Sequence, residues 1–423
     1  EFKEDELAQL SDVDGKEVST ESTTEFPYHR FDVTVNKNVQ PDDEIEIVWN
    51  GSSLDGRKVT MYAWNYKTTE WDELTSIIAG EAAFELVGSV TGDAYLQDSK
   101  VSVIVQDQIA NQGEDFTFVW MSDTQYYSES YPNIYNEQVD WIAANQEALN
   151  LEYVIHTGDI VNIWDDFDQW EVADKAMKVL DDAGIPYGVL AGNHDVDQKD
   201  NNYTNYYTYF GDQRFEDRSY FAGSYKNNRG HYDLISVNGN DFIIVYMGWG
   251  VDQDGIDWIN DVLEEHPNHK AILGFHEYLL ASGTRSPIGD ELFEKVVVPN
   301  ENVHAVLSGH YHNSQKLIDE IDDNGDGAAD RTVYQLLADY QGGPEGGQGY
   351  MRLLTFNMET NQMEVRTYSP YMDEYNYYDP EEFPEKDEFN LDWDLEPQLK
   401  EVATDYVEVN VYTNNLIDSV KNV

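Results

Sequence analysis

Five short polar motifs in the middle of this 423-residue chain combine carboxylate, amide and imidazole side chains. They are Ser122-Asp123-Thr124-Gln125, Thr157-Gly158-Asp159, Gly192-Asn193-His194-Asp195, Phe275-His276 and Gly309-His310-Tyr311-His312. Such side chains suit zinc, iron, manganese or magnesium, and the chain has no cysteine to supply a sulfur ligand. One carboxylate, Asp159, can bridge two cations. Two cations held about 3.5–4 Å apart can generate a bridging hydroxide and clamp an in-line displacement at phosphorus, so the motifs predict a two-metal hydrolytic site.

Each motif follows an apolar run that is typical of a buried strand. The runs cover residues 116–121, 153–156, 187–191, 271–275 and 303–307. Helical periodicity predicts helices over 133–148 and 167–183, the second with Gly184 as its C-cap. This alternation predicts a layered α/β domain with sheets inside and helices outside. Because the sites of such domains lie at the carboxyl ends of strands, we expect the five motifs to meet there.

The motif set resembles that of the calcineurin-like metallophosphoesterase family, over about residues 116 to 370. The resemblance implies a β-sandwich core flanked by helices, and hydrolysis of small phosphoric esters, mono- or diesters. It implies a first metal bound by Asp123 and His312, and a bridging Asp159 between two divalent or trivalent ions. The residues that would complete the second metal site are Asn193, His276 and His310.

Three motif residues have other implied roles. By the resemblance, His194 is not a ligand but faces the substrate and protonates the leaving oxygen, with Asp195 orienting its ring. Where the family usually has Asp-x-His, this chain has Gln125. An amide oxygen is neutral and a weaker ligand than imidazole, so Gln125 either ligates the first metal or hydrogen-bonds a bound water. The identity of the metals stays open among Zn, Fe, Mn and Mg.

Several residues beside the motifs have two interpretations. His156 precedes the Thr157-Gly158-Asp159 turn and either supports it or simply packs at a strand end. Four flanking residues either contact the phosphate or leaving group or have plain surface roles, and the surface role is favoured: Tyr126, Tyr127, Arg285 and Asn313.

A second metal signal lies in the acidic segment 322–330. The candidate calcium ligands are Asp322, Asn324, Asp326 and Asp330, at positions 1, 3, 5 and 9 of an EF-hand-like loop. The twelfth position is Val333 instead of Glu, and the flanks have strand patterns, so this is not a full EF-hand. We expect a structural Ca²⁺ that holds a hairpin; the alternative is an acidic, glycine-rich turn.

The rest of the chain predicts four segments. Residues 1–24 are polar and predict a linker or disordered end. Short β-like runs separated by turns predict an all-β sandwich accessory domain over 25–110. The catalytic domain is expected over 114–370, and an acidic C-terminal extension over 371–423.

The charge balance excludes some roles. The chain has 83 Asp and Glu against 25 Lys and Arg, a formal net charge of −58. Such a surface repels phosphate backbones and anionic lipid, which argues against a nucleic-acid scaffold or a membrane-surface role. No apolar run is long enough to predict a transmembrane helix. The acidity favours a secreted, extracellular protein of salty surroundings. The resemblance implies the same, since family members with Asp-x-Gln look like secreted or multidomain bacterial proteins; the oligomeric state stays open.

Two functions therefore compete. The leading hypothesis is a dinuclear metal-dependent phosphoesterase. The alternative is a catalytically degenerate phosphoesterase fold that acts as an extracellular binding module, and Gln125 favours it. A serine hydrolase is disfavoured because the chain lacks a Gly-x-Ser-x-Gly elbow.

Overall fold

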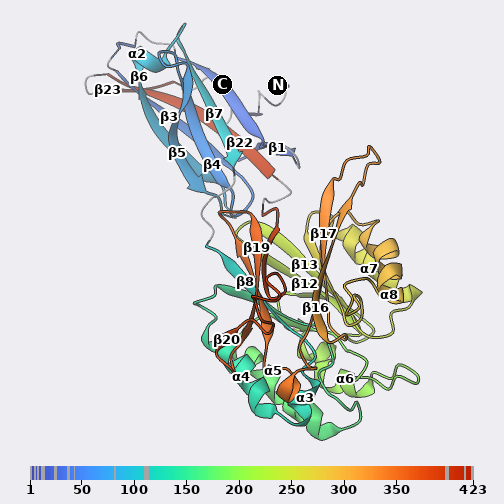
Figure 1. Ribbon diagram of the computed structural model, residues 1–423. Helices are drawn as coiled ribbons and strands as arrows, with labels where there is room; N and C mark the ends of the chain where they lie inside the picture. The colour runs from blue at the N-terminus through green and yellow to red at the C-terminus, as the bar shows by residue number, and fades with distance from the viewer. Residues whose placement is uncertain are drawn as a thin grey trace. The chain divides into compact units, whose positions relative to one another are not determined.

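The structure is a computed structural model of the chain, and it divides into two compact units (Figure 1). The first comprises Glu1–Gly113 and Glu396–Val423, and the second is Glu114–Leu395. The residues that the structure describes are 2–3, 6, 9–10, 15–22, 26–35, 39–41, 43–80, 82–108, 114–395, 400–413 and 416–420. Within these ranges, every helix is too short or too polar to cross a membrane.

The first unit is built from two antiparallel sheets with one shared core. One sheet has the order β1-β22-β3-β6, with β23 beside β22, and the other has the order β2-β7-β4-β5. The elements are β1 (Val18–Ser22), β2 (Tyr28–Thr34), β3 (Glu44–Ser52), β4 (Lys58–Asn65), β5 (Glu70–Ile78), β6 (Phe84–Thr91), α2 (Gly92–Tyr95), β7 (Lys100–Gln108), β22 (Lys400–Thr413) and β23 (Leu416–Val420). Alternate residues of β2 and β3 are buried, so each strand turns one face to the core. Side chains such as Trp49, Met61 and Val103 from both sheets fill that core.

The strand pairing differs from the expected boundaries at both ends of the chain. Strand β1 lies within the segment expected to be a linker, and it pairs with β22, with Val18 opposite Thr404. Because β22 also pairs with β3, residues that were expected to form an acidic extension complete a sheet of the first unit. Such long-range pairing leaves no local signal, since the partner strand is supplied by a distant part of the sequence. Residues 1, 4–5, 7–8, 11–14 and 23–24 of the expected linker lie outside the described residues.

The second unit contains two sheets of mixed direction that face each other across a core. The first sheet has the order β10-β9-β8-β18-β19-β20, with β21 beside β19, and the second has the order β11-β12-β13-β14-β15-β17-β16. The strands of the first sheet are β8 (Phe116–Met121), β9 (Leu151–His156), β10 (Tyr187–Val189), β18 (Met351–Asn357), β19 (Gln362–Ser369), β20 (Glu374–Tyr375) and β21 (Glu388–Asp392). Those of the second are β11 (Phe221–Tyr225), β12 (Gly230–Val237), β13 (Asn240–Met247), β14 (Lys270–Phe275), β15 (Val303–Ser308), β16 (Asn313–Ile321) and β17 (Arg331–Asp339). Because β20 and β21 pair with β19, this unit continues beyond residue 370, where the sequence pattern was expected to end it.

Helices cover the outer faces of both sheets. They are α3 (Gln125–Glu129), α4 (Pro132–Ala144), α5 (Phe167–Ala183), α6 (Thr204–Phe210), η1 (Asp212–Arg214), α7 (Gln253–Glu265), α8 (Pro287–Leu292), η2 (Phe293–Val297) and η3 (Pro344–Gly346). Helices α4 to α6 bury Ile142 and Trp170 in one cluster with Val154 of the first sheet. Helices α7 and α8 bury Ile259 and Leu292 against the second sheet, and Figure 1 shows them on that side of the unit. The predicted α/β layering of helices around a sheet core is confirmed.

Helix α5 shows how locally some of this structure is encoded. Its bounds, Phe167–Ala183, coincide with the helix expected from periodicity. The Asp166 side chain accepts a hydrogen bond from the Asp168 N–H at the N-terminus, and Gly184 ends the helix at a φ of 70°. Helix α5 therefore begins and ends on signals that are readable in the sequence.

Candidate metal centre

The motifs follow the carboxyl ends of parallel strands, and three of their residues adopt a backbone conformation that is rare for non-glycine residues. Asp123 after β8, Asp159 after β9 and His310 after β15 have φ values of 53°, 53° and 74°. Each such conformation costs about 1–3 kcal/mol and persists only where the surroundings enforce it. Here the Asp123 N–H donates to Gly158 O at 3.0 Å, and the His310 N–H donates to the Asp123 carboxylate at 3.2 and 3.3 Å. The turns therefore support one another.

Two glycines allow the carboxylates to lie against neighbouring backbone. A Cβ placed on Gly309 would lie 2.2 Å from Oδ2 of Asp123, and one on Gly192 would lie 2.1 Å from Oδ1 of Asp159. Any larger residue would push the carboxylate out of position. These glycines therefore have a steric role in two of the motifs.

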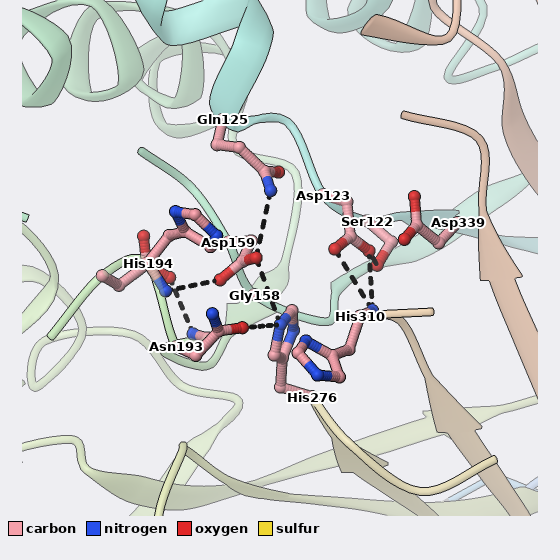
Figure 2. A network of polar contacts seen from close by, with 12 residues as sticks. Ser122, Asp123, Gln125, Gly158, Asp159, Asn193, His194, His276, His310 and Asp339 are labelled. Atoms are coloured by element: carbon pink, nitrogen blue, oxygen red, sulfur yellow. Dashed lines mark hydrogen bonds and ion pairs between the residues drawn. The ribbon is translucent and has the colours of Figure 1, made fainter. Parts of the chain in front are cut away.

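The side chains expected to bind the second metal come together. Asp159, His276 and His310 offer ligand atoms within 4.8 Å of one another, the one such group of three acidic, His or Cys residues found in the described part of the chain. The His276 Nε2 atom lies 3.0 Å from Asn193 Oδ1 and 3.3 Å from Asp159 Oδ2, as Figure 2 shows. The other ring nitrogen, Nδ1, lies 2.8 Å from Thr157 O and can donate its hydrogen there. If the ring gives up its second proton, this bond leaves Nε2 as an acceptor facing other acceptors, an arrangement that a cation would stabilise.

The electrostatics of this group favour positive charge. Burial lowers the pKa of His276, but the Asp159 and Asp123 carboxylates outweigh this effect and raise it to about 10. Burial, and then the neighbouring His276, lower the pKa of His310 to about 4. The His276 ring is therefore protonated beside the two carboxylates, and the His310 ring is neutral. The donor set fits a divalent cation, which can replace that proton.

The residues expected to bind the first metal are arranged less tightly. Asp123 is buried, and burial together with the Asp339 carboxylate raises its pKa well above the usual range. Gln125 is the first residue of α3; its Nε2 donates to Asp159 Oδ2 at 3.0 Å, and its buried Oε1 has no hydrogen-bond partner. His312 lies at the rim, with its side chain 54% exposed. An unpartnered buried oxygen beside two carboxylates also fits a cation.

Asp339 is a residue of this centre that sequence reasoning missed. It is the last residue of β17 and is only 2% exposed. Its Oδ2 has no hydrogen-bond partner and lies 4.0 Å from Nε2 of His312, and burial raises its pKa to about 7. The available signal was its position directly after the mostly apolar run 333–338, a signal similar to the one that marks the five motifs.

His194 is held by its backbone and by one ring nitrogen. Its N–H donates to Asp159 Oδ1 at 2.9 Å, and its Nδ1 lies 2.8 Å from the carbonyl oxygen of Asn162. The carbonyl oxygen can only accept, so Nδ1 carries the hydrogen. The Nε2 atom is therefore the position where His194 can gain or release a proton.

Asp195 does not orient the His194 ring, in contrast to the expectation from the motif. Its Oδ1 accepts the N–H groups of Ile160 and Val161 at 2.8 and 2.9 Å, and its Oδ2 accepts that of Gly192 at 2.7 Å. The carboxylate therefore ties the Asp159 turn to the Asn193 turn. The carbonyl oxygen of Asn162, which no side-chain motif reveals, takes the role expected of Asp195.

His156 is hydrogen-bonded to residues of two of the motifs. The Gly158 N–H donates to its Nδ1 at 3.2 Å, so its Nε2–H can donate to Thr124 Oγ1, 3.0 Å away. Burial lowers the pKa of His156 to about 3, so the ring is neutral and keeps this pattern. Of its two interpretations, the structure favours support of the turn.

Three of the residues that flank the motifs form hydrogen bonds outside the metal centre. Arg285 donates to Gln335 Oε1 at 2.6 Å, and the buried Tyr127 hydroxyl accepts the Gly349 N–H at 2.8 Å. Asn313 donates to a backbone carbonyl oxygen at 2.8 Å. Each of these three side chains is therefore hydrogen-bonded to a residue that is not one of the expected metal ligands.

The acidic segment 322–330 connects β16 and β17 as a hairpin loop. Its candidate calcium ligands are Asp322, Asn324, Asp326 and Asp330, and all four are exposed. Asp322 Oδ1 accepts the Gly325 N–H at 2.6 Å, and Asp330 Oδ2 accepts the Asp323 N–H at 2.8 Å. These bonds shape the turn, and calcium binding at the loop stays a prediction.

Residues 116–314 match the family model of the calcineurin-like phosphoesterases, so this part of the chain is a calcineurin-like phosphoesterase domain. This match confirms the family resemblance that the motifs indicate. Proteins of this family in general hydrolyse phosphoesters with the help of metal ions, generally two. Residues 2–119 match a second model, described as the C-terminal domain of an uncharacterized protein.

Two curated proteins are similar in sequence. The uncharacterized protein YvnB of Bacillus subtilis (strain 168) is 57% identical over 414 residues, which cover 98% of this chain and 32% of YvnB. A probable cyclic nucleotide phosphodiesterase of Psychrobacter arcticus is 24% identical over 182 residues, 41% of this chain and 61% of that protein. The chain thus spans about a third of the first relative and about three fifths of the second.

Two solved structures align with the chain at low sequence identity. The purple acid phosphatase PPD1 from yellow lupin aligns with a TM-score of 0.43 and 12% identity, covering 85% of this chain and 74% of that one. GAP50 of Plasmodium, described as an anchor in the inner membrane complex, aligns with a TM-score of 0.37 and 13% identity, covering 62% of this chain and 87% of that one.

Proposed function

We propose that the unit Glu114–Leu395 hydrolyses small phosphoric esters at a dinuclear metal centre. The observation that supports this most strongly is the meeting of Asp159, His276 and His310 with the Asn193 amide oxygen. Two bound cations would supply the positive charge that activates water for attack and stabilises the phosphoryl oxygens. The proposal names Asp159 as the residue shared by both ions.

The protein's own residues would orient the ligands and move a proton. The Thr157 carbonyl oxygen sets the tautomer of His276, so that its Nε2 faces the centre. The Asn162 carbonyl oxygen does the same for His194, and we propose that the Nε2 atom of this ring faces the substrate. We propose that His194 donates a proton from Nε2 to the leaving oxygen, which is general acid catalysis.

The proposal is tested by turnover of nitrophenyl phosphate and bis(nitrophenyl) phosphate after metal reconstitution. Asp159→Ala and His310→Ala should each lose turnover, while circular dichroism shows a retained fold. Undiminished turnover in both variants would end the proposal.

The substrate class is proposed from the relative in Psychrobacter. That relative is described as a probable cyclic nucleotide phosphodiesterase, and its similarity supports including a cyclic nucleotide beside the two synthetic esters. A higher kcat/KM for the diesters would assign the enzyme to diester hydrolysis, and the reverse ratio would assign it to monoesters.

The alternative function is a binding module that has lost catalysis. It is favoured by Gln125, whose amide hydrogen-bonds Asp159 at the position where the family usually has an imidazole. A purified protein with fewer than two transition-metal ions per chain and no turnover toward any ester of the panel would support this alternative.

We also propose that the protein works outside a bacterial cell in salty surroundings. The formal net charge of −58 supports this, since dissolved cations would screen the repulsion between surface carboxylates. The melting temperature should therefore rise with salt concentration, and a melting temperature that falls with salt would contradict the proposal.

A structural calcium ion in the loop 322–330 is a separate proposal. It is supported by the spacing of the acidic residues and by their position in one hairpin loop. Calorimetry on the chelator-stripped protein should detect a Ca²⁺ site that Asp322→Ala removes, and equal Ca²⁺ binding by both proteins would exclude it.

A further inference from the structure

Strand β17 delivers a carboxylate to the centre that none of the five motifs contains. It pairs in parallel with β15, the strand that precedes His310, so its carboxyl end lies at the same sheet edge. It also pairs with β16 in a register that places Asp339 opposite Asn313, the residue after His312. The loop beyond β17 is equally close, since a Cβ on Gly342 would lie 2.9 Å from Nδ1 of His312.

Only one of the two oxygens of the Asp339 carboxylate has a hydrogen-bond partner. Its Oδ1 accepts the Gln341 N–H at 2.9 Å, whereas its Oδ2 is buried and has no hydrogen-bond partner. The nearest basic atom to that oxygen is Nε2 of His312 at 4.0 Å, too far for a hydrogen bond. Figure 2 shows the carboxylate beside that of Asp123. A buried carboxylate oxygen without a partner is costly unless a cation is bound there.

A second buried oxygen in the same centre lacks a partner. The Gln125 amide donates its N–H to Asp159, and its Oε1 is buried without a hydrogen bond. Gln125 stands where the resemblance implies an imidazole, so the first metal lacks one strong donor. The unpartnered oxygens of Gln125 and Asp339 are two independent observations that point to a cation beside Asp123.

We propose that the Asp339 carboxylate is an additional ligand of the first metal, next to Asp123 and His312. The inference rests on the proposed dinuclear site. The strong metal ligand that the Asp-x-Gln motif lacks would then be supplied by Asp339 at the end of β17. The negative charge of Asp339 compensates for the weaker, neutral amide of Gln125.

The ligand set has a consequence for the choice of metal. With three carboxylates and one imidazole, the first site is richer in oxygen than the second, which contains two imidazoles. Carboxylate-rich sites suit Mn²⁺ and Mg²⁺, and imidazole suits Zn²⁺ and Fe. We therefore expect the two sites to differ in metal preference, and Mn²⁺ to be a suitable probe for the first.

The experiment measures Mn²⁺ binding to the chelator-stripped full chain by calorimetry, together with the melting temperature in chelator and in Mn²⁺. The variant is Asp339→Asn, which keeps the size and removes the charge. The matched control is Asp233→Asn, because Asp233 is equally buried in the same unit but contacts Tyr153 and His231 instead of the centre. Turnover of nitrophenyl phosphate is recorded in parallel.

The wild type should bind two Mn²⁺ ions. Asp339→Asn should keep one site and weaken the other at least tenfold, while Asp233→Asn keeps both. In chelator, Asp339→Asn should melt no lower than the wild type, because it loses an unpartnered charge. If Asp339→Asn does not fold, Asp339→Glu should fold and bind the second ion more weakly than the wild type.

Other results would overturn the assignment. Two Mn²⁺ sites of unchanged affinity in a folded Asp339→Asn or Asp339→Glu variant would show that Asp339 is not a ligand. Fewer than two sites in the wild type would contradict the dinuclear centre and this assignment together. A wild type that binds two ions but has no turnover, together with an Asp339→Asn variant that binds only one, would contradict the proposed hydrolase. The same result would support Asp339 as a metal ligand.

Discussion

Buried carboxylates are neutralised differently in the two units of this protein. In the first unit, Asp107 accepts hydrogen bonds from Arg57, at 2.9 Å to Oδ1 and at 3.2 and 2.6 Å to Oδ2, and both side chains are almost fully buried. In the second unit, Asp159 faces His276 at 3.3 Å and Asp339 faces a ring nitrogen at 4.0 Å. A guanidinium holds its charge permanently, whereas an imidazole can stay neutral and bind a metal.

The buried histidines show the same contrast. In the first unit, burial lowers the pKa of His29 to about 4, and its ring contacts the hydroxyls of Thr404 and Thr20 at 2.7 and 2.9 Å. In the second unit, carboxylates raise the pKa of His276 to about 10. The His29 ring is therefore satisfied by hydroxyl groups of the protein, whereas His276 lies among carboxylates that a cation would neutralise.

Removal of the shared carboxylate should have the largest effect. Asp159→Ala should lower turnover by more than about 10³-fold, beyond the loss expected for one electrostatic stabiliser, because both ions lose a ligand. Metal content should fall below one ion per chain. The control is Asp165→Ala, an exposed acidic residue a few positions later, which should keep both. Normal metal content in Asp159→Ala would contradict the assignment.

Loss of the proton donor should have the next largest effect. His194→Gln should reduce turnover by about 10²- to 10⁴-fold, the range typical of general acids. Metal content should stay normal, since the contact from residue 194 to Asp159 is made by the backbone N–H. A variant that loses its metal instead would assign His194 to the ligands.

Loss of the guanidinium should affect stability alone. Arg57→Met leaves the buried Asp107 carboxylate without its guanidinium partner, and we expect a loss of about 3–5 kcal/mol in the free energy of unfolding of the first unit. The metal content of the second unit should be unchanged. The double variant Arg57→Met with Asp107→Leu should recover most of the stability, because two apolar groups need no pairing. A single variant that unfolds like the wild type would contradict the contrast between the units.

Acid should destabilise the first unit through His29. The pKa of His29 is about 4 in the folded chain and 6.5 in its unperturbed state, so the unfolded state binds more protons between these values. Stability is therefore full above pH 6.5 and falls by about 2–3 kcal/mol as the pH drops to 4. His29→Gln should flatten this dependence in thermal melts. An unchanged pH slope in the variant would assign the acid sensitivity to other groups.

Salt should have the smallest effect. An anionic ester must approach a chain of net charge −58, and dissolved ions screen that repulsion. Raised salt should lower KM by about twofold, with little change in kcat. The control is a substrate without net charge, whose KM should not move. A KM that rises with salt for the anionic ester would show that attraction to the metal centre dominates.

Much of the metal centre was predictable from the sequence because its signals are local. Apolar runs predict strands, and parallel strands bring the residues at their carboxyl ends to one edge of the sheet. For that reason the types and order of residues predicted that Asp159, Asn193, His276 and His310 would meet. The same holds for α5, whose N-cap and C-terminal Gly184 are adjacent in sequence to the helix they bound.

The remaining features depend on contacts between distant parts of the chain, and only the tertiary structure decided them. The role of Asp195 depends on which N–H groups its carboxylate reaches, and that of Asp339 depends on the register of β17 against β16. Strand β22 completes a sheet that begins almost 400 residues earlier. Pairing and burial are properties of two surfaces in contact, so neither can be read from one segment alone.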